Sequence, residues 1–243
     1  MSKSIEVSAS ILAADFANLA YEITRSQIAG VDHFHVDVMD GHFVPNLTIG
    51  PVVIEAIRPF TKLPLEAHLM IENPWDYIES HAKAGADIIQ IHVECYGKLR
   101  KSCSQYGQWP KEVDTIDKEL LLRDLKRIRA LGKKAFIAIN PGTPLFKEIL
   151  PECDGVLVMS VNPGFAGQEF ISSALSKIKA LKANFKGVIA IDGGINAQTA
   201  PEAINAGAHL LITGSYFYKA PNAKEAVDLL KNLKQSNLLN VNK

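Results

Sequence analysis

Two side chains that commonly bind metal ions lie two residues apart in the segment 33–46, HFHVDVMDGHFVPN. The first half of this segment alternates as a strand does, so His35, Asp37 and Met39 share one face and apolar side chains take the other. Burying a carboxylate without a partner is costly, and an imidazole and a carboxylate at this spacing can reach one cation. The pattern therefore predicts either a metal site or a hydrogen-bonded His–Asp pair in a core, and both interpretations stay open at this point.

The composition limits the classes of function. The chain has 243 residues, 47% of them hydrophobic, and 26 basic residues balance 26 acidic ones. Balanced charge does not favour nucleic acid as a partner, and no window approaches the roughly 18 apolar residues of a membrane span. We expect no secretory signal, because no long apolar run follows the first lysine. The three cysteines, Cys95, Cys103 and Cys153, lack CxxC spacing and are typical of reduced thiols in a cytoplasmic protein.

Short apolar runs alternate with amphipathic stretches along the whole chain. We expect strands at residues 5–12, 34–39, 65–71, 88–93, 135–139, 155–161, 188–191 and 210–213. Helices are expected at residues 15–29, 51–60, 74–84, 118–131, 144–150, 171–185, 198–206 and 223–233. Short apolar strands are typical of a parallel sheet covered on both faces. Eight such units predict a single α/β domain, a (β/α)8 TIM barrel over residues 1–243, with a doubly wound open sheet as the alternative.

One segment interrupts this alternation. Residues 96–117 separate the fourth strand from its helix and show no clear hydrophobic period. Connections of this length are uncommon and often form lids or binding loops, although a surface excursion without a function fits the pattern equally well. The aromatic rings of Tyr96, Tyr106 and Trp109 need to be buried, either over the mouth of the barrel or against a neighbouring subunit.

Catalytic groups in this fold gather where the strands end. His35 and Asp37 lie on the second strand, His68 lies on the third, and Asp192 ends the seventh. Four ligand-type residues at matched positions are difficult to explain as core, so they predict a site for one divalent metal ion per subunit. The mixed nitrogen and oxygen ligands suit Zn²⁺, Fe²⁺, Mn²⁺ or Co²⁺. Other polar residues at these strand ends are Ser10, His92, Glu94 and Ser215.

Glycine-rich loops, PGFAG, DGG and GS, follow strands six, seven and eight. In this fold the loops after strands seven and eight are the usual phosphate position, where backbone N–H groups and the start of a short helix face the anion. Glycine permits the close approach of the backbone. No lysine occupies the carboxyl end of a strand, which disfavours a Schiff-base aldolase, and no DxKxxD motif is present.

These motifs together make the sequence resemble the ribulose-phosphate 3-epimerases. The resemblance runs almost end to end and is carried by SASILAADF, HFHVDVMDGHFVPNLTIGP, EAHLMIENP, INPGTP, VMSVNPGFAGQEF, IDGGI and the final GS. It implies a cytoplasmic, homo-oligomeric (β/α)8 barrel of the pentose phosphate pathway. The implied reaction interconverts D-ribulose 5-phosphate and D-xylulose 5-phosphate.

The resemblance also implies roles for individual residues. Asp37 and Asp192 become the expected acid/base pair, and His35, Asp37, His68 and Asp192 the expected metal ligands. The substrate is expected to contact Ser10, His68, Gly164, Phe165, Ala166, Gly167, Asp192, Gly193, Gly194, Gly214 and Ser215. Met39, Met70 and Met159 are expected to line the pocket. In the implied mechanism one carboxylate removes the C3 proton, a metal ion stabilises the enediolate, and the other carboxylate returns a proton to the opposite face.

The sequence departs from the family pattern in three places. The 96–117 insertion is longer than usual, Tyr216 follows Ser215, and Ala166 replaces a common glycine. The first two lie on the catalytic face, which keeps a 3-epimerase of a hexulose 6-phosphate such as allulose 6-phosphate as an alternative. An inactive sugar-phosphate-binding protein is a weaker alternative. Because the family's usual lid already covers the mouth and the family forms oligomers, we expect the aromatics of the insertion to contact a neighbouring subunit.

Overall fold

The computed structural model describes residues 4–99 and 109–233. Its central strands are β1 (Glu6–Ser10), β2 (His33–Met39), β3 (Leu65–Met70), β4 (Ile88–His92), β7 (Lys134–Ile139), β8 (Gly155–Met159), β9 (Val188–Asp192) and β10 (Leu210–Thr213). They are all parallel and close into a barrel in the order β1, β10, β9, β8, β7, β4, β3, β2. Closure confirms the predicted (β/α)8 barrel and excludes the open doubly wound sheet.

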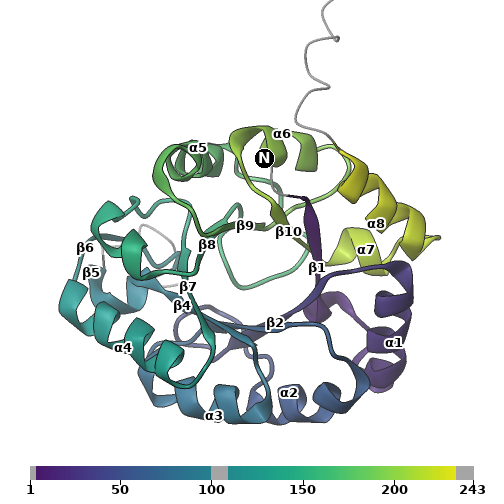
Figure 1. Ribbon diagram of the computed structural model, residues 1–243, viewed down its shortest axis with the longest axis horizontal. Coiled ribbons are helices and arrows are strands. Elements are labelled where there is room, and N and C mark those ends of the chain that lie inside the picture. The colour runs from purple at the N-terminus through teal and green to yellow at the C-terminus, as the bar shows by residue number, and fades with distance from the viewer. Residues whose placement is uncertain (1–3, 100–108, 234–243) are drawn as a thin grey trace, which may run out of the picture.

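Helices surround this barrel on its outside, as Figure 1 shows. They are α1 (Leu19–Ala29), α2 (Pro51–Ile57), α3 (Ile78–Ala84), α4 (Lys118–Ala130), α5 (Leu175–Asn184), α6 (Ala200–Ala206), α7 (Ser215–Tyr218) and α8 (Ala223–Asn232). Where a short helix is expected near 144–150, the structure has a 3-10 helix, Lys147–Glu152, with Pro151 inside it. Proline lacks the N–H that an α-helix needs at that position. Within the described residues, no helix is both long and apolar enough to cross a membrane.

The strands divide their side chains between two environments. Phe34, Val36 and Val38 of β2 belong to the apolar layer between barrel and helices. The alternate face of each strand lines the interior, which is apolar along β8 to β10 with Leu157, Ala190, Leu210 and Ile212. Along β1 to β4 the interior is polar instead, with the buried residues Ser8, His35, Glu66, His68, Gln90 and His92. Most of the titratable side chains buried in the barrel interior therefore lie in one half of it.

The described part of the insertion after β4 contains two short strands, which the lack of a hydrophobic period did not predict. Strand β5 (Gly97–Leu99) pairs antiparallel with β6 (Val113–Ile116). The Tyr96 ring is buried, and its hydroxyl donates to Asp124 Oδ2 at 2.9 Å. The Trp109 Nε1–H donates to the carbonyl oxygens of His42 and Phe43, in the loop after β2. The predicted subunit contact is thus wrong for Tyr96, Trp109 binds its own chain, and Tyr106 lies outside the described residues.

Two helices end at glycines that differ in the space available for a side chain. Gly30 and Gly85 follow α1 and α3 with φ of 94° and 111°, a conformation that costs other residues about 1–2 kcal/mol. A Cβ on Gly85 would lie 2.8 Å from Arg58 Cδ, whereas no described atom lies within 4 Å of the same position on Gly30. The Arg58 guanidinium is held by Asp87 Oδ2 and by the carbonyl oxygens of residues 61, 63 and 85.

We therefore expect Gly85→Ala to lower the free energy of unfolding by more than Gly30→Ala, which should cost about 1–2 kcal/mol from backbone strain alone. Urea denaturation of both variants measures the difference. Equal losses for the two variants would show that the Arg58 side chain moves aside without cost.

Candidate active site

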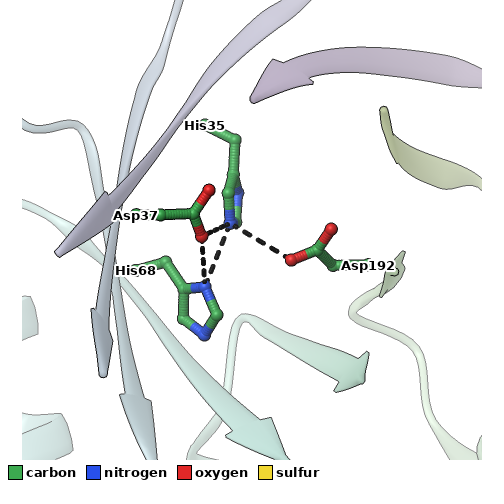
Figure 2. A group of neighbouring side chains, drawn as sticks. All are labelled: His35, Asp37, His68 and Asp192. Atoms are coloured by element: carbon green, nitrogen blue, oxygen red, sulfur yellow. Dashed lines mark hydrogen bonds and ion pairs between the residues drawn. The ribbon is translucent and has the colours of Figure 1, made fainter. Parts of the chain in front are cut away.

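Four side chains from three strands converge at the carboxyl end of the barrel (Figure 2). His35 Nε2 lies 3.1 Å from His68 Nδ1, 3.3 Å from Asp37 Oδ1 and 3.8 Å from Asp192 Oδ2. His68 Nδ1 lies 3.0 Å from Asp37 Oδ1. One ligand atom from each residue falls within 4.8 Å of the other three. This is the set that the strand ends predicted.

Register between parallel strands brings these residues together. Asp37 on β2 lies beside His68 on β3, and His35 lies beside Glu66. Asp192 comes from the far side of the interior, where it ends β9 beside Met159. Since the strands are parallel and in register, side chains at matched heights meet without any loop having to position them.

Hydrogen bonds hold the Asp37 carboxylate and the backbone of both aspartates in place. The Ser10 hydroxyl donates to Asp37 Oδ2 at 2.7 Å, and the Thr48 hydroxyl donates to the Asp37 carbonyl oxygen at 2.6 Å. The Ser160 backbone N–H and hydroxyl both donate to the Asp192 carbonyl oxygen. The same hydroxyl lies 2.7 Å from the Gly193 carbonyl oxygen. These bonds fix the Asp37 carboxylate oxygens and, for both aspartates, the main chain from which the side chain extends.

The environment of the histidines fits a divalent metal ion. Each ring turns one nitrogen toward the shared point and has its other nitrogen engaged elsewhere: His35 Nδ1 by Glu66 Oε2 at 3.0 Å, and His68 Nε2 by His92 Nε2 at 2.8 Å. Partners on the outer nitrogen are the usual arrangement for metal-binding imidazoles. Two nitrogens and two carboxylate oxygens are also a ligand set that first-row divalent metals accept.

Burial and mutual charge shift the pKa values of the four groups apart. Burial would lower the pKa of His35, but Asp37, Glu66 and Asp192 raise it well above its usual value. Burial would raise the pKa of Asp37, but His35 and His68 hold it well below its usual range. Burial lowers the pKa of His68 to about 3. Burial raises the pKa of Asp192 to about 7, because the opposing attraction of His35 is partly offset by repulsion from Asp37 and Glu66.

A cavity of about 240 Å³ opens above this group. Of the predicted site residues, only His35 and His68 do not line it, because both are fully buried beneath it. The predicted residues that line it are Ser10, Asp37, Met39, Met70, Met159, Gly164, Phe165, Ala166, Gly167, Asp192, Gly193, Gly194, Gly214 and Ser215. Tyr216 and Gln168 line it as well. Among the described residues, no lysine or arginine reaches the cavity wall.

Comparison with known proteins assigns this chain to a family. The model of the ribulose-phosphate 3 epimerase family matches residues 6–109 and 111–218. The chain belongs to the ribulose-phosphate 3-epimerase family. It is 46% identical to the ribulose-phosphate 3-epimerase of Synechocystis sp., with 97% of this chain and 96% of that protein covered. It is 44% identical to the Bacillus subtilis enzyme of the same name, over 95% of this chain and all of that protein. The chain is therefore an epimerase acting on a sugar phosphate.

Solved structures extend the likeness of this epimerase to other barrel enzymes. KGPDC from Streptococcus mutans superposes with a TM-score of 0.65 at 13% identity, covering 95% of this chain and 99% of that one. A 3-hexulose-6-phosphate synthase gives a TM-score of 0.59 at 15% identity, covering 93% and 98%. At this level of identity the likeness shows the shared fold.

Sequence reasoning overlooked the residues that support the site from outside the cavity. Glu66, Thr48 and Ser160 carried no expectation, and His92 and Glu94 were noted without a role. The alternation of β3 could have identified Glu66, because a charged residue two positions before His68 must share its buried face. Ser160 and Thr48 act through backbone carbonyl groups, for which the sequence gives no signal.

The pKa shifts predict how metal binding depends on pH. In the metal-free protein His35 and Asp192 hold protons near neutrality, and a metal ion must displace them. Because Asp192 has a pKa of about 7, its protonation should weaken metal binding about tenfold when the pH falls from about 8 to about 6. Displacing the proton of His35 should weaken metal binding further over the same range. Competition with a coloured chelator at the two pH values measures the change. An affinity that stays constant over this range would contradict the assigned protonation states.

Proposed function

We propose that this protein is a metal-dependent 3-epimerase that interconverts D-ribulose 5-phosphate and D-xylulose 5-phosphate, as in the pentose phosphate pathway. The observation that carries the proposal is the convergence of His35, Asp37, His68 and Asp192 on one point at the floor of the cavity. One divalent ion per subunit, Zn²⁺, Fe²⁺, Mn²⁺ or Co²⁺, would be held by these four residues. When bound, such an ion acts as a Lewis acid that stabilises negative charge on substrate oxygens.

Asp37 and Asp192 are proposed as the two acid/base groups. The C3 proton of the substrate is acidic because C3 lies next to the C2 carbonyl, and its removal leaves a flat enediolate. Inversion at C3 requires one group on each side of this plane. Asp37 comes from β2 and Asp192 from β9, and Figure 2 shows their carboxylates approaching the shared point from opposite sides. In the metal-free protein, burial raises the pKa of Asp192 to about 7, whereas His35 and His68 hold the pKa of Asp37 low, so the two carboxylates differ in their affinity for a proton.

The remaining cavity residues are proposed to bind and shield the substrate. Met39, Met70 and Met159 form apolar, nonacidic walls that cannot protonate the enediolate. The loop residues 164–167 and the pairs at 193–194 and 214–215 are proposed to surround the phosphate through backbone N–H groups. Glycine is required at 193 for packing as well, since its φ is 118° and a Cβ there would lie 2.6 Å from Val161 Cγ2. Ser10, which lines the cavity, is the proposed contact to the sugar. His68, which the sequence also suggested for this role, lies beneath the cavity with its Nε2 atom against His92, so its proposed role is that of a metal ligand.

The two alternatives from the sequence gain no support from the site. A hexulose 6-phosphate epimerase would need the same four residues at the bottom of the cavity, so these residues do not favour it. The relatives reported above are named ribulose-phosphate 3-epimerases. An inactive binding protein would lack a ligand or a base, whereas all four residues are present and convergent. A comparison of kcat/KM for the pentulose and hexulose phosphates distinguishes the first alternative.

We also propose that the protein acts as a homo-oligomer in the cytoplasm. Leu47 and Val52, the second of them in the first turn of α2, are 75% and 72% exposed and are available for contact with another subunit. Cys95 and Cys153 are free thiols, which fits a reducing compartment. Light scattering of the purified protein tests the oligomeric state.

Deuterium exchange tests the two-base mechanism. In deuterated water the wild-type protein should introduce deuterium at C3 of its product, and chelation should remove activity that added divalent metal restores. Asp37→Asn and Asp192→Asn should each slow epimerisation by about 10²–10⁴-fold or more. Each variant keeps one carboxylate, so one should exchange the C3 proton of ribulose 5-phosphate only and the other that of xylulose 5-phosphate only.

Metal content must be measured alongside, because both residues are also proposed ligands. Glu55→Gln, an exposed carboxylate on α2, is the matched control and should behave as wild type. Epimerisation without any exchange from solvent, or full activity in either aspartate variant with metal bound, would contradict the mechanism.

A further inference from the structure

The two ligand histidines are backed by two separate buried carboxylates that no step above uses. Behind His68, the Nε2 atom lies 2.8 Å from His92 Nε2, and the two rings stack at 5.0 Å. His92 Nδ1 lies 3.0 Å from Glu94 Oε2. His68 and His92 are fully buried, and Glu94 is 2% exposed.

The outer end of this chain of contacts is anchored to the backbone. The Asn140 backbone N–H, at the end of β7, donates to Glu94 Oε1 at 2.8 Å. The Lys177 ammonium group on α5 donates to the Asn140 carbonyl oxygen at 3.1 Å. Glu94 therefore cannot rotate away from His92 without losing a buried backbone hydrogen bond.

His35 contacts a buried carboxylate directly, without an intervening histidine. Glu66 Oε2 lies 3.0 Å from His35 Nδ1 and accepts a second hydrogen bond from Gln90 Nε2 at 3.1 Å. The other oxygen, Oε1, lies 2.9 Å from His33 Nδ1. Glu66 is fully buried, so its position between these partners is fixed by packing as well.

We propose that Glu66 and the His92–Glu94 pair are positioning residues that set the tautomers of the two ligand histidines. A carboxylate only accepts hydrogen bonds, so His35 must carry its proton on Nδ1 and turn the lone pair of Nε2 toward the metal. By the same rule His92 carries its proton on Nδ1, which leaves His92 Nε2 an acceptor. His68 must then carry its proton on Nε2, and the lone pair of Nδ1 faces the metal.

Replacing Glu94 by glutamine should invert this second chain. The Asn140 N–H still needs an acceptor, so the carboxamide oxygen takes the position of Oε1 and the NH2 group faces His92 Nδ1. His92 must then accept at Nδ1 and carry its proton on Nε2. That proton points at His68 Nε2, which can accept it only if the His68 proton moves to Nδ1, where the metal binds.

Two measurements on the full-length protein test this inference. In the zinc-loaded wild type, ¹⁵N NMR of the imidazole nitrogens should find protons on His35 Nδ1, His68 Nε2 and His92 Nδ1. Chelator competition should show that Glu94→Gln weakens zinc affinity about 10–100-fold, with His92 carrying its proton on Nε2. Asp124→Asn, which changes a fully buried carboxylate that contacts Tyr96 and Arg123, is the matched control and should leave zinc affinity unchanged.

The inference rests on the proposed metal site, and the outcomes separate the two. If the wild type binds no divalent metal, the proposed site itself fails. If the wild type binds zinc but Glu94→Gln binds it within twofold of the wild-type affinity, only the positioning role is overturned. A proton on His68 Nδ1 or on His92 Nε2 in the wild type overturns it too, and this result does not depend on whether the variant folds.

Discussion

The structure depends on hydrogen bonds and ion pairs between the titratable side chains buried in one half of the barrel interior. Asp37, Glu66 and Glu94 are removed from water together with His35, His68 and His92. A single unpaired charge in such a place costs several kcal/mol, so the arrangement is stable only if every group is matched. The hydrogen bonds across β2, β3 and β4 provide this matching. The proposed cation site lies between the ligand atoms of His35, Asp37, His68 and Asp192.

The barrel makes such a network geometrically simple. Parallel strands in register place Asp37 beside His68, and the period of two along each strand stacks successive layers on one face. The apolar half of the interior, along β8 to β10, contributes only Asp192 at its carboxyl edge. That asymmetry gives Asp192 fewer compensating partners than Asp37 has. It explains why burial raises the pKa of Asp192 while that of Asp37 stays low.

Much of this could be predicted from the sequence, because the strands are marked by short apolar runs and the ligands by their types at strand ends. His35 and Asp37 shared a face by alternation alone, and the fold then brought His68 and Asp192 to the same edge. The pairing of β5 with β6 could not be predicted, since it joins residues 14 and 19 positions apart and no alternating pattern marks these strands. The burial of Tyr96 against Asp124 is likewise a tertiary contact. The short helix expected near 144–150 is a 3-10 helix that lies a few residues later, at Lys147–Glu152, and its exact bounds and type could not be predicted from the sequence.

The proposed metal site is made of two histidines and two aspartates that hold one divalent ion. X-ray absorption at the metal edge of the zinc-loaded protein can verify this ligand set, because the fine structure reports the identity and distance of the ligands. We expect two imidazole nitrogens and carboxylate oxygens at about 2.0–2.2 Å from the metal. A spectrum without imidazole scattering, or one dominated by sulfur at about 2.3 Å, would contradict it.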